Sequence, residues 1–267
     1  MPTITDDQIR SFQRRIVAFY RIHGRFLPWR KTTDPYAITV AELMLQQTQV
    51  ERVIPKYEAW SKKWPTWRAL SKATTRQLLT AWSGLGYNRR CLHLGKMAKI
   101  VETEYGGLLP SEQAALEKLP GVGRYTSRAI LIFAHNVPLI TIDTNIRRVL
   151  IYEFGLPLSI TRGELEELAW RLLPKRRSRD WHNALMDYGA LRVPKRTAPT
   201  GVRQGKFEGS RRQIRGEILR RLTKSKSAGL SAVAQAMGIR IESVREAAAK
   251  LEQEGVVKVI RGRVRLK

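Results

Sequence analysis

The strongest constraint on this chain is a short turn, Gly121-Val122-Gly123, that stands directly before a run of helix-forming residues. Two glycines around one small apolar residue allow a tight turn whose backbone N–H groups point outward together. Because a helix is expected to open beside it at Tyr125–His135, the turn can bind a phosphate without a charged side chain. Such a contact fixes the register on a nucleic acid and carries no sequence information. The alternative interpretation is an ordinary turn that precedes a helix.

The charge of the chain favours a polyanionic partner. It has 49 Lys and Arg residues against 23 Asp and Glu residues, which gives a formal net charge of +26. This excess favours a nucleic acid as the partner. A membrane surface would also attract the charge, but the sequence has no long apolar run, signal peptide or lipidation motif. We therefore expect a monomer in the cytoplasm or nucleoid that does not bind membranes.

Few residues are available for metal or disulfide chemistry. Cys91 is the single cysteine, so this chain cannot form a disulfide framework or a cysteine-ligated cluster by itself. The four histidines are scattered and lack the spacing of metal ligands. We expect no metal site and no cofactor.

The first 194 residues are predicted to be helical. Apolar residues recur with the period of a helix, and glycines or prolines separate the segments. No alternating strand pattern of any length occurs before residue 195. The expected helices are 6–24, 38–49, 51–63, 75–82, 89–105, 111–117, 125–134, 143–154, 161–172 and 180–190. The pattern predicts an all-α domain over residues 1–194.

A change in composition marks a second domain. Proline, glycine and charge between 195 and 209 indicate a basic linker. Beyond it, three helices are expected at 211–223, 230–237 and 241–254, followed by a hairpin around Arg261-Gly262-Arg263. This order predicts a winged helix-turn-helix over 210–267, with 241–254 as its recognition helix. From Lys195 onward the chain has 19 Lys and Arg residues but only six Glu residues, and this positive charge favours DNA contact. The alternative is a winged helix that binds a protein or forms a dimer.

Two carboxylates are candidates for catalysis. Glu42 stands among apolar neighbours, and because burial raises the pKa of a carboxyl group, it suits a general acid. Cleavage of a purine N-glycosidic bond needs such an acid, because a protonated base leaves without separating a full anion. Asp143 precedes another helical run and suits an ionised carboxylate that stabilises a sugar cation. The plainer alternatives are a charge at the start of a helix for Glu42 and an N-cap for Asp143.

Several motifs in order resemble the helix-hairpin-helix (HhH-GPD) DNA glycosylases that include endonuclease III. The resemblance covers residues 27 to about 191 and is strongest to the adenine DNA glycosylase (MutY) branch. Its motifs are LPWR at 27–30, DPY at 34–36, AELMLQQTQVERVIPKY at 41–57, GLGY at 84–87, LPGVGRYT at 119–126, IDTNIRRV at 142–149 and NALMDYGAL at 183–191.

The resemblance implies roles for individual residues. Glu42 is then the acid that protonates adenine, Asp143 stabilises or captures the sugar cation, and Tyr125 places a hydroxyl near that intermediate. The residues implied at the DNA or the base are Arg30, Gln46, Gln47, Tyr87, Gly121, Val122, Gly123 and Asn183. Among these, Gln47 and Tyr87 help to fill the space left by the flipped nucleotide, and Arg30 and Asn183 lie near the extruded base.

The departures from the family pattern imply further properties. Bifunctional relatives carry a Schiff-base lysine where this chain has Tyr125, so we expect a monofunctional glycosylase. Most relatives hold an iron-sulfur cluster on four cysteines after the segment that ends at Leu191, whereas none follows here. We expect no cluster. The C-terminal part also does not resemble the Nudix-like domain by which adenine glycosylases sense 8-oxoguanine.

Three functions remain in view from the sequence. The first is excision of adenine opposite guanine or 8-oxoguanine. The second is a thymine or uracil glycosylase for T·G and U·G mismatches, because that branch can share both the acid and the tyrosine. The third is a non-catalytic DNA-binding protein on the same scaffold, which the joint presence of Glu42, Tyr125 and Asp143 argues against.

Overall fold

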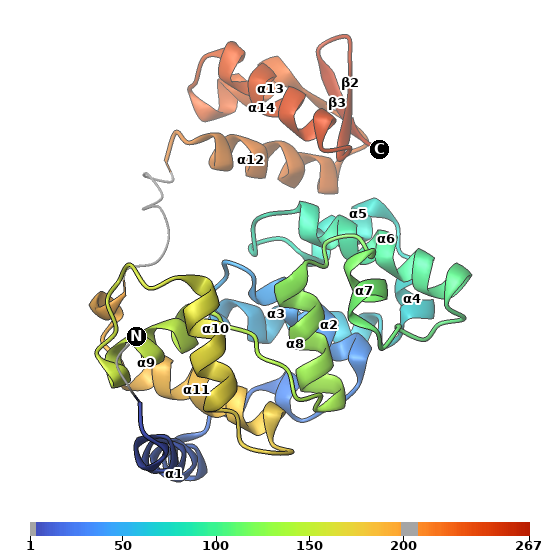
Figure 1. The fold of residues 1–267 in the computed structure, drawn as a ribbon. Helices are drawn as coiled ribbons and strands as arrows, with labels where there is room; N and C mark the ends of the chain where they lie inside the picture. Colours follow the sequence, from blue (N-terminus) through green and yellow to red (C-terminus); the bar gives the residue numbers. More distant parts are fainter. Residues whose placement is uncertain (1–3, 199–207) are drawn as a thin grey trace. The chain divides into compact units, whose positions relative to one another are not determined.

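The computed structural model describes residues 4–198 and 208–267, and its elements are mainly helices, as predicted (Figure 1). The helices before residue 195 are α1 (Asp6–His23), η1 (Pro28–Arg30), α2 (Pro35–Leu45), α3 (Val50–Lys63), α4 (Trp67–Ser71), α5 (Thr75–Ala81), α6 (Arg89–Glu104), α7 (Gln113–Glu117), α8 (Arg124–His135), α9 (Thr144–Phe154), α10 (Arg162–Arg171) and α11 (Ser178–Leu191). They are followed by η2 (Lys195–Thr197), α12 (Arg211–Lys224), β1 (Ala228–Gly229), α13 (Leu230–Met237), α14 (Ile241–Gln253), β2 (Val257–Ile260) and β3 (Arg263–Leu266). Across the described residues, no strand precedes β1, as the sequence pattern predicts.

Most predicted helix boundaries lie within three residues of those observed, and two differences are informative. The predicted helix 38–49 begins instead at Pro35 and ends at Leu45. Proline suits the first turn of a helix, where its missing N–H has no partner to lose. The one-turn helix α4 is missed because five residues are too few to show a period. Its local signal is Thr66, whose side chain accepts from the Ala69 N–H.

The helices form two compact units. The first contains Met1–Glu42, Ser111–Lys118 and Val122–Val202, and the second contains Leu43–Pro110, Leu119–Gly121 and Arg203–Lys267. These units group residues by packing, whereas the sequence prediction divides the chain at 194 and 209. Most of the expected linker, residues 199–207, lies outside the described residues. The division at 194 and 209 stays a prediction.

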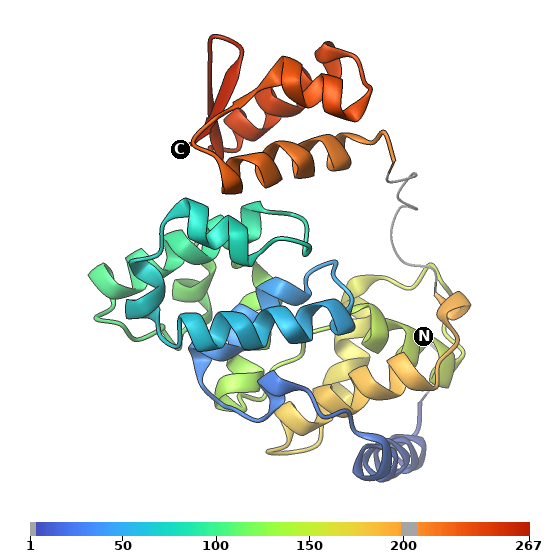
Figure 2. The ribbon, with the colours of Figure 1, turned by 180° about the vertical axis from the view of Figure 1, so that it is seen from behind.

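The first unit has a core where α1, α9, α10 and α11 meet. Helices α1 and α11 lie side by side in both views (Figures 1 and 2). Phe12 of α1 packs edge-on against Trp181 of α11, with ring centroids 5.8 Å apart, and against Phe154 at 5.1 Å. Edge-to-face rings fill such a core at favourable geometry. The packing holds α9 and α11 in a fixed relation.

The C-terminal residues have the element order of a winged helix-turn-helix, as predicted. After α12, strands β1, β3 and β2 form an antiparallel sheet in that order. Along the chain, α13 and α14 come between β1 and β2, and both helices lie beside the β2–β3 hairpin (Figure 1). Arg261 and Gly262 both have positive φ, which is the geometry of a two-residue hairpin turn. The two-residue strand β1 is absent from the sequence prediction because it is too short to alternate.

Within the second unit, α12 packs against α5. Nη1 of Arg76 in α5 donates to the carbonyl oxygens of Leu222, Thr223 and Ser225 at 2.6, 3.2 and 2.9 Å. These carbonyls end α12, and a cation there satisfies them and the helix dipole. The winged helix is therefore attached to α5 by a charged cap.

None of the helices over 4–198 and 208–267 combines the length and hydropathy needed to cross a membrane. The same residues contain no cluster of three His, Cys, Asp or Glu side chains that could hold a metal ion.

Candidate active site

Asp143 caps the N-terminus of α9 and uses both carboxylate oxygens. Oδ1 accepts from the Ile146 N–H at 2.7 Å, and Oδ2 accepts from Asn145 Nδ2 at 2.8 Å. These bonds favour the ionised carboxylate, but burial outweighs them and raises the pKa of Asp143 above its usual value. The N-cap interpretation and a catalytic role are thus compatible, because the cap fixes the carboxylate in place.

Helix α11 holds the start of α9. A Cβ atom at Gly189 would lie 2.7 Å from the Asn145 carbonyl oxygen, so the two helices approach closely only because this residue is glycine. Nη2 of Arg148 bridges them, donating to the Gly189 carbonyl at 2.5 Å and to Asn145 Oδ1 at 2.9 Å. Asn145 in turn bonds Asp143, so this network orients the carboxylate.

His182 holds the segment without regular secondary structure that leads to Asp143. Its Nε2 accepts from the Thr141 N–H at 3.3 Å, so the proton of the neutral ring is on Nδ1, which donates to the Ser178 carbonyl at 2.7 Å. Burial lowers the pKa of His182 to about 4, and the ring stays neutral at physiological pH. These contacts give His182 a structural role.

Glu42 has a raised pKa, which suits a general acid. It is 9% exposed in α2, and burial together with the charge of Asp143 raises its pKa to about 7. Arg30 lowers the pKa by a smaller effect. A carboxyl group with this pKa is protonated in a substantial fraction of molecules at neutral pH, which a general acid requires.

Tyr125 lies in the first turn of α8, close enough to both carboxylates to respond to their charges. Burial, then Glu42, then Asp143 raise the pKa of its phenol well above the usual value. The hydroxyl therefore stays protonated and can donate a hydrogen bond. The structure thus brings together three candidate catalytic residues that are 18 or more positions apart in the sequence.

Arg30 lies on η1, close enough to Glu42 to lower its pKa, and Asn183 lies on α11. The Arg30 guanidinium makes a two-pronged bond to Asp187, Nη1 to Oδ2 at 2.7 Å and Nη2 to Oδ1 at 2.9 Å. Arg25 also binds Asp187, through Nε to Oδ1 at 2.6 Å. These partners hold the pKa of Asp187 below its usual value despite full burial. Asn183 is buried on the same helix.

The glycine turn contains one residue, Gly121, in a conformation that glycine adopts easily. Gly121 has φ +83°, where a side chain is disfavoured, and a Cβ atom there would lie 2.7 Å from the His93 ring. Val122 is buried, and Gly123 is the N-cap of α8 without a side-chain cap. Glycine has no side chain that could accept hydrogen bonds from the first N–H groups of α8. An anion-binding turn requires that no side chain caps these groups.

Gln47 and Tyr87, the expected wedge residues, share an uncommon backbone conformation. Gln47 has φ +55° and Tyr87 has φ +45°. Positive φ is costly for residues with side chains and concentrates at functional sites. Both residues are exposed, with Tyr87 at 44%, so the strained backbone presents them to solvent.

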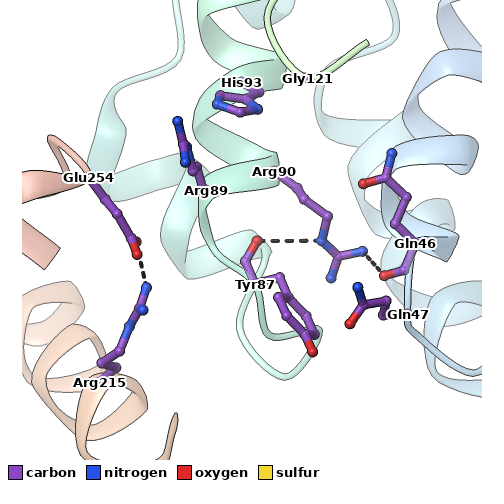
Figure 3. Close-up of a pocket in the computed structure, with 9 residues that line it drawn as sticks. All are labelled: Gln46, Gln47, Tyr87, Arg89, Arg90, His93, Gly121, Arg215 and Glu254. Atoms are coloured by element: carbon purple, nitrogen blue, oxygen red, sulfur yellow. Dashed lines mark hydrogen bonds and ion pairs between the residues drawn. The ribbon is translucent and has the colours of Figure 1, made fainter. Parts of the chain in front are cut away.

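Arg90 links the segment that carries Gln47 to the segment that carries Tyr87 (Figure 3). It is 7% exposed, and Nη1 donates to the carbonyls of Leu43, Met44 and Gln46 at 2.7, 2.9 and 2.5 Å. The other amino group, Nη2, donates to the carbonyls of Leu85 and Gly86 and to Thr48 Oγ1, at 3.0 to 3.1 Å. These bonds satisfy the carbonyls where α2 ends, which explains why the predicted helix 38–49 stops at Leu45.

Replacing Arg90 with methionine is expected to destabilise the protein by at least about 3 kcal/mol, because several buried carbonyls lose their donor. Denaturant unfolding measures the free energy. Arg89→Met is the matched control, because Arg89 is the exposed neighbour, and its effect should stay within about 0.5 kcal/mol. Equal effects of the two substitutions would contradict the role given to Arg90.

The cysteine content does not fit a four-cysteine iron-sulfur cluster. Cys91 is buried in α6, and its thiol donates to the Asn88 carbonyl at 3.0 Å. Burial raises the pKa of the thiol well above its usual value, which opposes the thiolate that a metal needs. One inert thiol cannot supply four ligands.

The sequence of this chain matches the model of a known family. The model for "HhH-GPD superfamily base excision DNA repair protein" matches residues 40–175, which include Glu42, Tyr125 and Asp143. The chain belongs to the HhH-GPD superfamily. Its helical architecture is that of an HhH-GPD glycosylase, as predicted.

Relatives of two specificities are similar to this HhH-GPD protein. An adenine DNA glycosylase of Mycobacterium tuberculosis strain H37Rv is 34% identical over 247 residues, which cover 82% of this chain and 80% of the relative. That of Buchnera aphidicola subsp. Baizongia pistaciae is 38% identical over 185 residues, 67% of this chain but only 52% of the relative. A thymine-DNA glycosylase of Aeropyrum pernix is 33% identical over 174 residues, covering 63% and 78%.

A solved thermostable thymine-DNA glycosylase resembles this HhH-GPD protein in structure. Its TM-score is 0.63 at 29% sequence identity, over 70% of this chain and 88% of that one. The comparisons therefore establish the superfamily, and they include relatives that excise adenine and relatives that excise thymine by name.

Sequence reasoning about this HhH-GPD protein misses two residues. Asp187 stands between apolar neighbours in NALMDYGAL, the same local signal that singled out Glu42, and could have been found by it. Arg90 has no such signal, because Arg89 beside it has the same composition and is exposed. Only the packing of α6 distinguishes them.

Proposed function

We propose that this protein is a monofunctional adenine DNA glycosylase of base excision repair, acting on adenine opposite guanine or 8-oxoguanine in double-stranded DNA. The observation that carries the proposal is the carboxyl pair. Glu42, with a pKa of about 7, provides a proton, and Asp143, held by two hydrogen bonds, provides a negative charge. Two carboxyl groups in different environments divide acid and electrostatic roles.

In the proposed reaction Glu42 donates its proton to a ring nitrogen of the extruded adenine. The N-glycosidic bond then breaks, and its electron pair leaves with the neutral base. The Asp143 carboxylate stabilises the positive charge that develops on the deoxyribose. Water adds to the sugar cation, loses a proton to the solvent and leaves an abasic site. The hydroxyl of Tyr125, which stays protonated, donates a hydrogen bond near the reacting sugar.

The remaining predicted residues are proposed to bind and position the substrate. The Gly121-Val122-Gly123 turn binds a backbone phosphate. Gln46 also contacts the duplex. Gln47 and Tyr87 enter the space that the flipped nucleotide leaves, which offsets the few kcal/mol of unstacking. Their strained backbone supports this assignment. Arg30, fixed by Asp187, and Asn183 line the space for the extruded base.

Excision of thymine or uracil from T·G or U·G pairs is the second candidate. The Aeropyrum pernix relative and the solved thermostable thymine-DNA glycosylase favour it. A pyrimidine leaving group has different protonation requirements, so Glu42→Gln should reduce thymine release less than adenine release.

The deciding experiment measures base release from duplexes that contain a single A·8-oxoguanine, A·G, T·G or U·G pair. Alkaline cleavage at the abasic site reports release. Adenine release that is lost in Asp143→Asn would support the proposal. Release of thymine or uracil alone would favour the second candidate, and no release from any duplex would favour a non-catalytic DNA-binding protein.

The protein is expected to show little lyase activity, since the phenol of Tyr125 cannot form a Schiff base with the sugar. Borohydride should trap almost no wild-type protein on its DNA substrate. The Tyr125→Lys variant is the informative comparison, because it supplies the missing amine and should become trapped. Efficient trapping of the wild type would overturn the monofunctional assignment. We also propose that the enzyme works without an iron-sulfur cluster.

A further inference from the structure

The hairpin formed by β2 and β3 carries positive charge without any negative charge of its own (Figure 1). Residues 257–267 include five Lys and Arg residues and no Asp or Glu. Lys258 lies directly opposite Arg265 in the register of the two strands. The neighbouring outward pair is Ile260 and Arg263. These four side chains are exposed, whereas the residues that alternate with them are buried or half-buried, and we call the four the wing face.

The wing face places two like charges against each other. Side chains directly opposite on one face of an antiparallel pair have Cβ atoms about 4.5–5.5 Å apart, and like charges there destabilise the pair. Neither Lys258 nor Arg265 forms an ion pair with any residue that the structure describes. A fold that leaves such a repulsion uncompensated departs from the usual rule, and departures of this kind are expected at functional sites.

The acidic residues nearby have other partners. Glu217, Glu246 and Glu254 each form their ion pairs with arginines of α12. Glu252 accepts a hydrogen bond from the backbone N–H of Val259 at 2.8 Å. The arginines of α12 are thus largely neutralised within the winged helix, and the charge of the wing face is not.

Helix α14, the predicted recognition helix, has the opposite charge balance. Its charged residues are three acids and two bases, all exposed: Glu242, Glu246, Glu252, Arg245 and Lys250. In a helix-turn-helix the N-terminal residues of the recognition helix contact the base edges. Glu242 lies in that first turn and would bring a negative charge to the duplex. The charge therefore favours the wing face over α14 as the surface that meets a polyanion.

We infer that the wing face is a second DNA-binding surface, which contacts the phosphate backbone of undamaged duplex DNA, and that α14 does not read bases. Lysine and arginine donate to phosphate oxygens, and such contacts position a protein on a duplex without specifying a sequence. The wing face holds the protein on DNA away from any lesion. The inference goes beyond the proposed function, because it requires no excised base.

The test measures the affinity of the full chain for undamaged duplexes of two unrelated sequences over a range of salt concentrations. The double variant Lys258→Gln/Arg265→Gln should lose two phosphate contacts. The slope of log affinity against log salt should become shallower by about 2, since each contact contributes about 0.9. At 0.1 M salt the affinity for both sequences should fall by roughly tenfold or more. An unchanged slope and affinity would overturn the inference.

The matched control is the double variant Arg245→Gln/Lys250→Gln, which removes the same charge from exposed positions of α14. Its slope and affinity should stay close to those of wild type. An equal loss in both double variants would mean that only net charge matters, and the wing face would then be no site. A loss confined to the α14 variant would make α14 the DNA-binding helix and would equally contradict the inference.

Thermal unfolding distinguishes a binding role from a structural one. Because Lys258→Gln/Arg265→Gln removes two opposed cations, its melting temperature should equal or exceed that of wild type. A lower melting temperature together with weaker binding would assign the loss to the fold and reject the wing face as a site. Binding to vesicles rich in phosphatidylserine that this variant loses, with its duplex affinity unchanged, would assign the face to a membrane surface instead.

The base-release experiment separates this inference from the proposed function. With saturating enzyme, Lys258→Gln/Arg265→Gln should release base at the wild-type rate, because the wing face contains none of the proposed catalytic residues. If no duplex releases a base, the proposed function fails and the affinities still decide the role of the wing face. If adenine is released but the affinities for undamaged duplex are unchanged in the variant, the wing assignment fails and the proposed function holds.

Discussion

Asp143→Asn should abolish most base release, reducing the single-turnover rate by roughly 10²–10³-fold or more. The amide is neutral, so it no longer stabilises the positive charge on the sugar. The fold should survive, because asparagine is as good an N-cap as aspartate and can still accept from the Ile146 N–H. The measurement is the release rate from the preferred duplex with excess enzyme.

The stability of Asp143→Asn provides a second measurement, because the release rate should fall while the stability should not. A pKa raised by folding means that the folded protein binds the proton more tightly than the unfolded chain does. The ionised carboxylate therefore costs stability at pH values above its pKa. The neutral amide removes this cost, and the melting temperature at pH 7 should be equal or higher. Asp143→Ala, which loses the cap, should cost about 1 kcal/mol.

Asp180→Asn is the control for a carboxylate outside the site, because Asp180 is exposed in the first turn of α11. It should release base at the wild-type rate. If Asp143→Asn released base normally, the catalytic assignment would be wrong. If it failed to fold, the capping argument would be wrong instead.

Glu42→Gln is expected to slow adenine release by roughly 10²–10⁴-fold, the range over which a general acid contributes. Glutamine has nearly the same shape but cannot transfer a proton to the leaving base. For wild type the active form is the protonated one. With a pKa of about 7, its fraction falls about tenfold between pH 6 and pH 8, and the release rate should fall with it.

The pH profile tests this assignment independently of the absolute rate. Glu42→Gln should show no fall between pH 6 and pH 8, because the titrating group is gone. Glu104→Gln, a substitution of an exposed glutamate in α6, should keep the wild-type profile. A tenfold fall that persists in Glu42→Gln would place the acid on another residue.

Local sequence signals predict most helices and the hairpin. Caps, proline and glycine act within a few residues, so Thr5, Thr74 and Thr161 mark helix starts wherever the rest of the chain lies. Arg261-Gly262 likewise adopts its turn from local geometry. Short elements such as α4 and β1 are not predicted, because they contain too few residues to show a periodic pattern.

The sequence by itself determined the mainly helical architecture, the glycine turn, and the types of the catalytic candidates at Glu42, Tyr125 and Asp143. Their chemistry belongs to the side chains and can be read without contacts. Only the tertiary structure decided that Glu42 has a pKa of about 7, that Arg90 is buried while Arg89 is not, and that Arg215 and Glu254 line a pocket with Gln47. Desolvation, neighbouring charges and pockets arise from residues distant in the chain, and no local pattern encodes which of them meet.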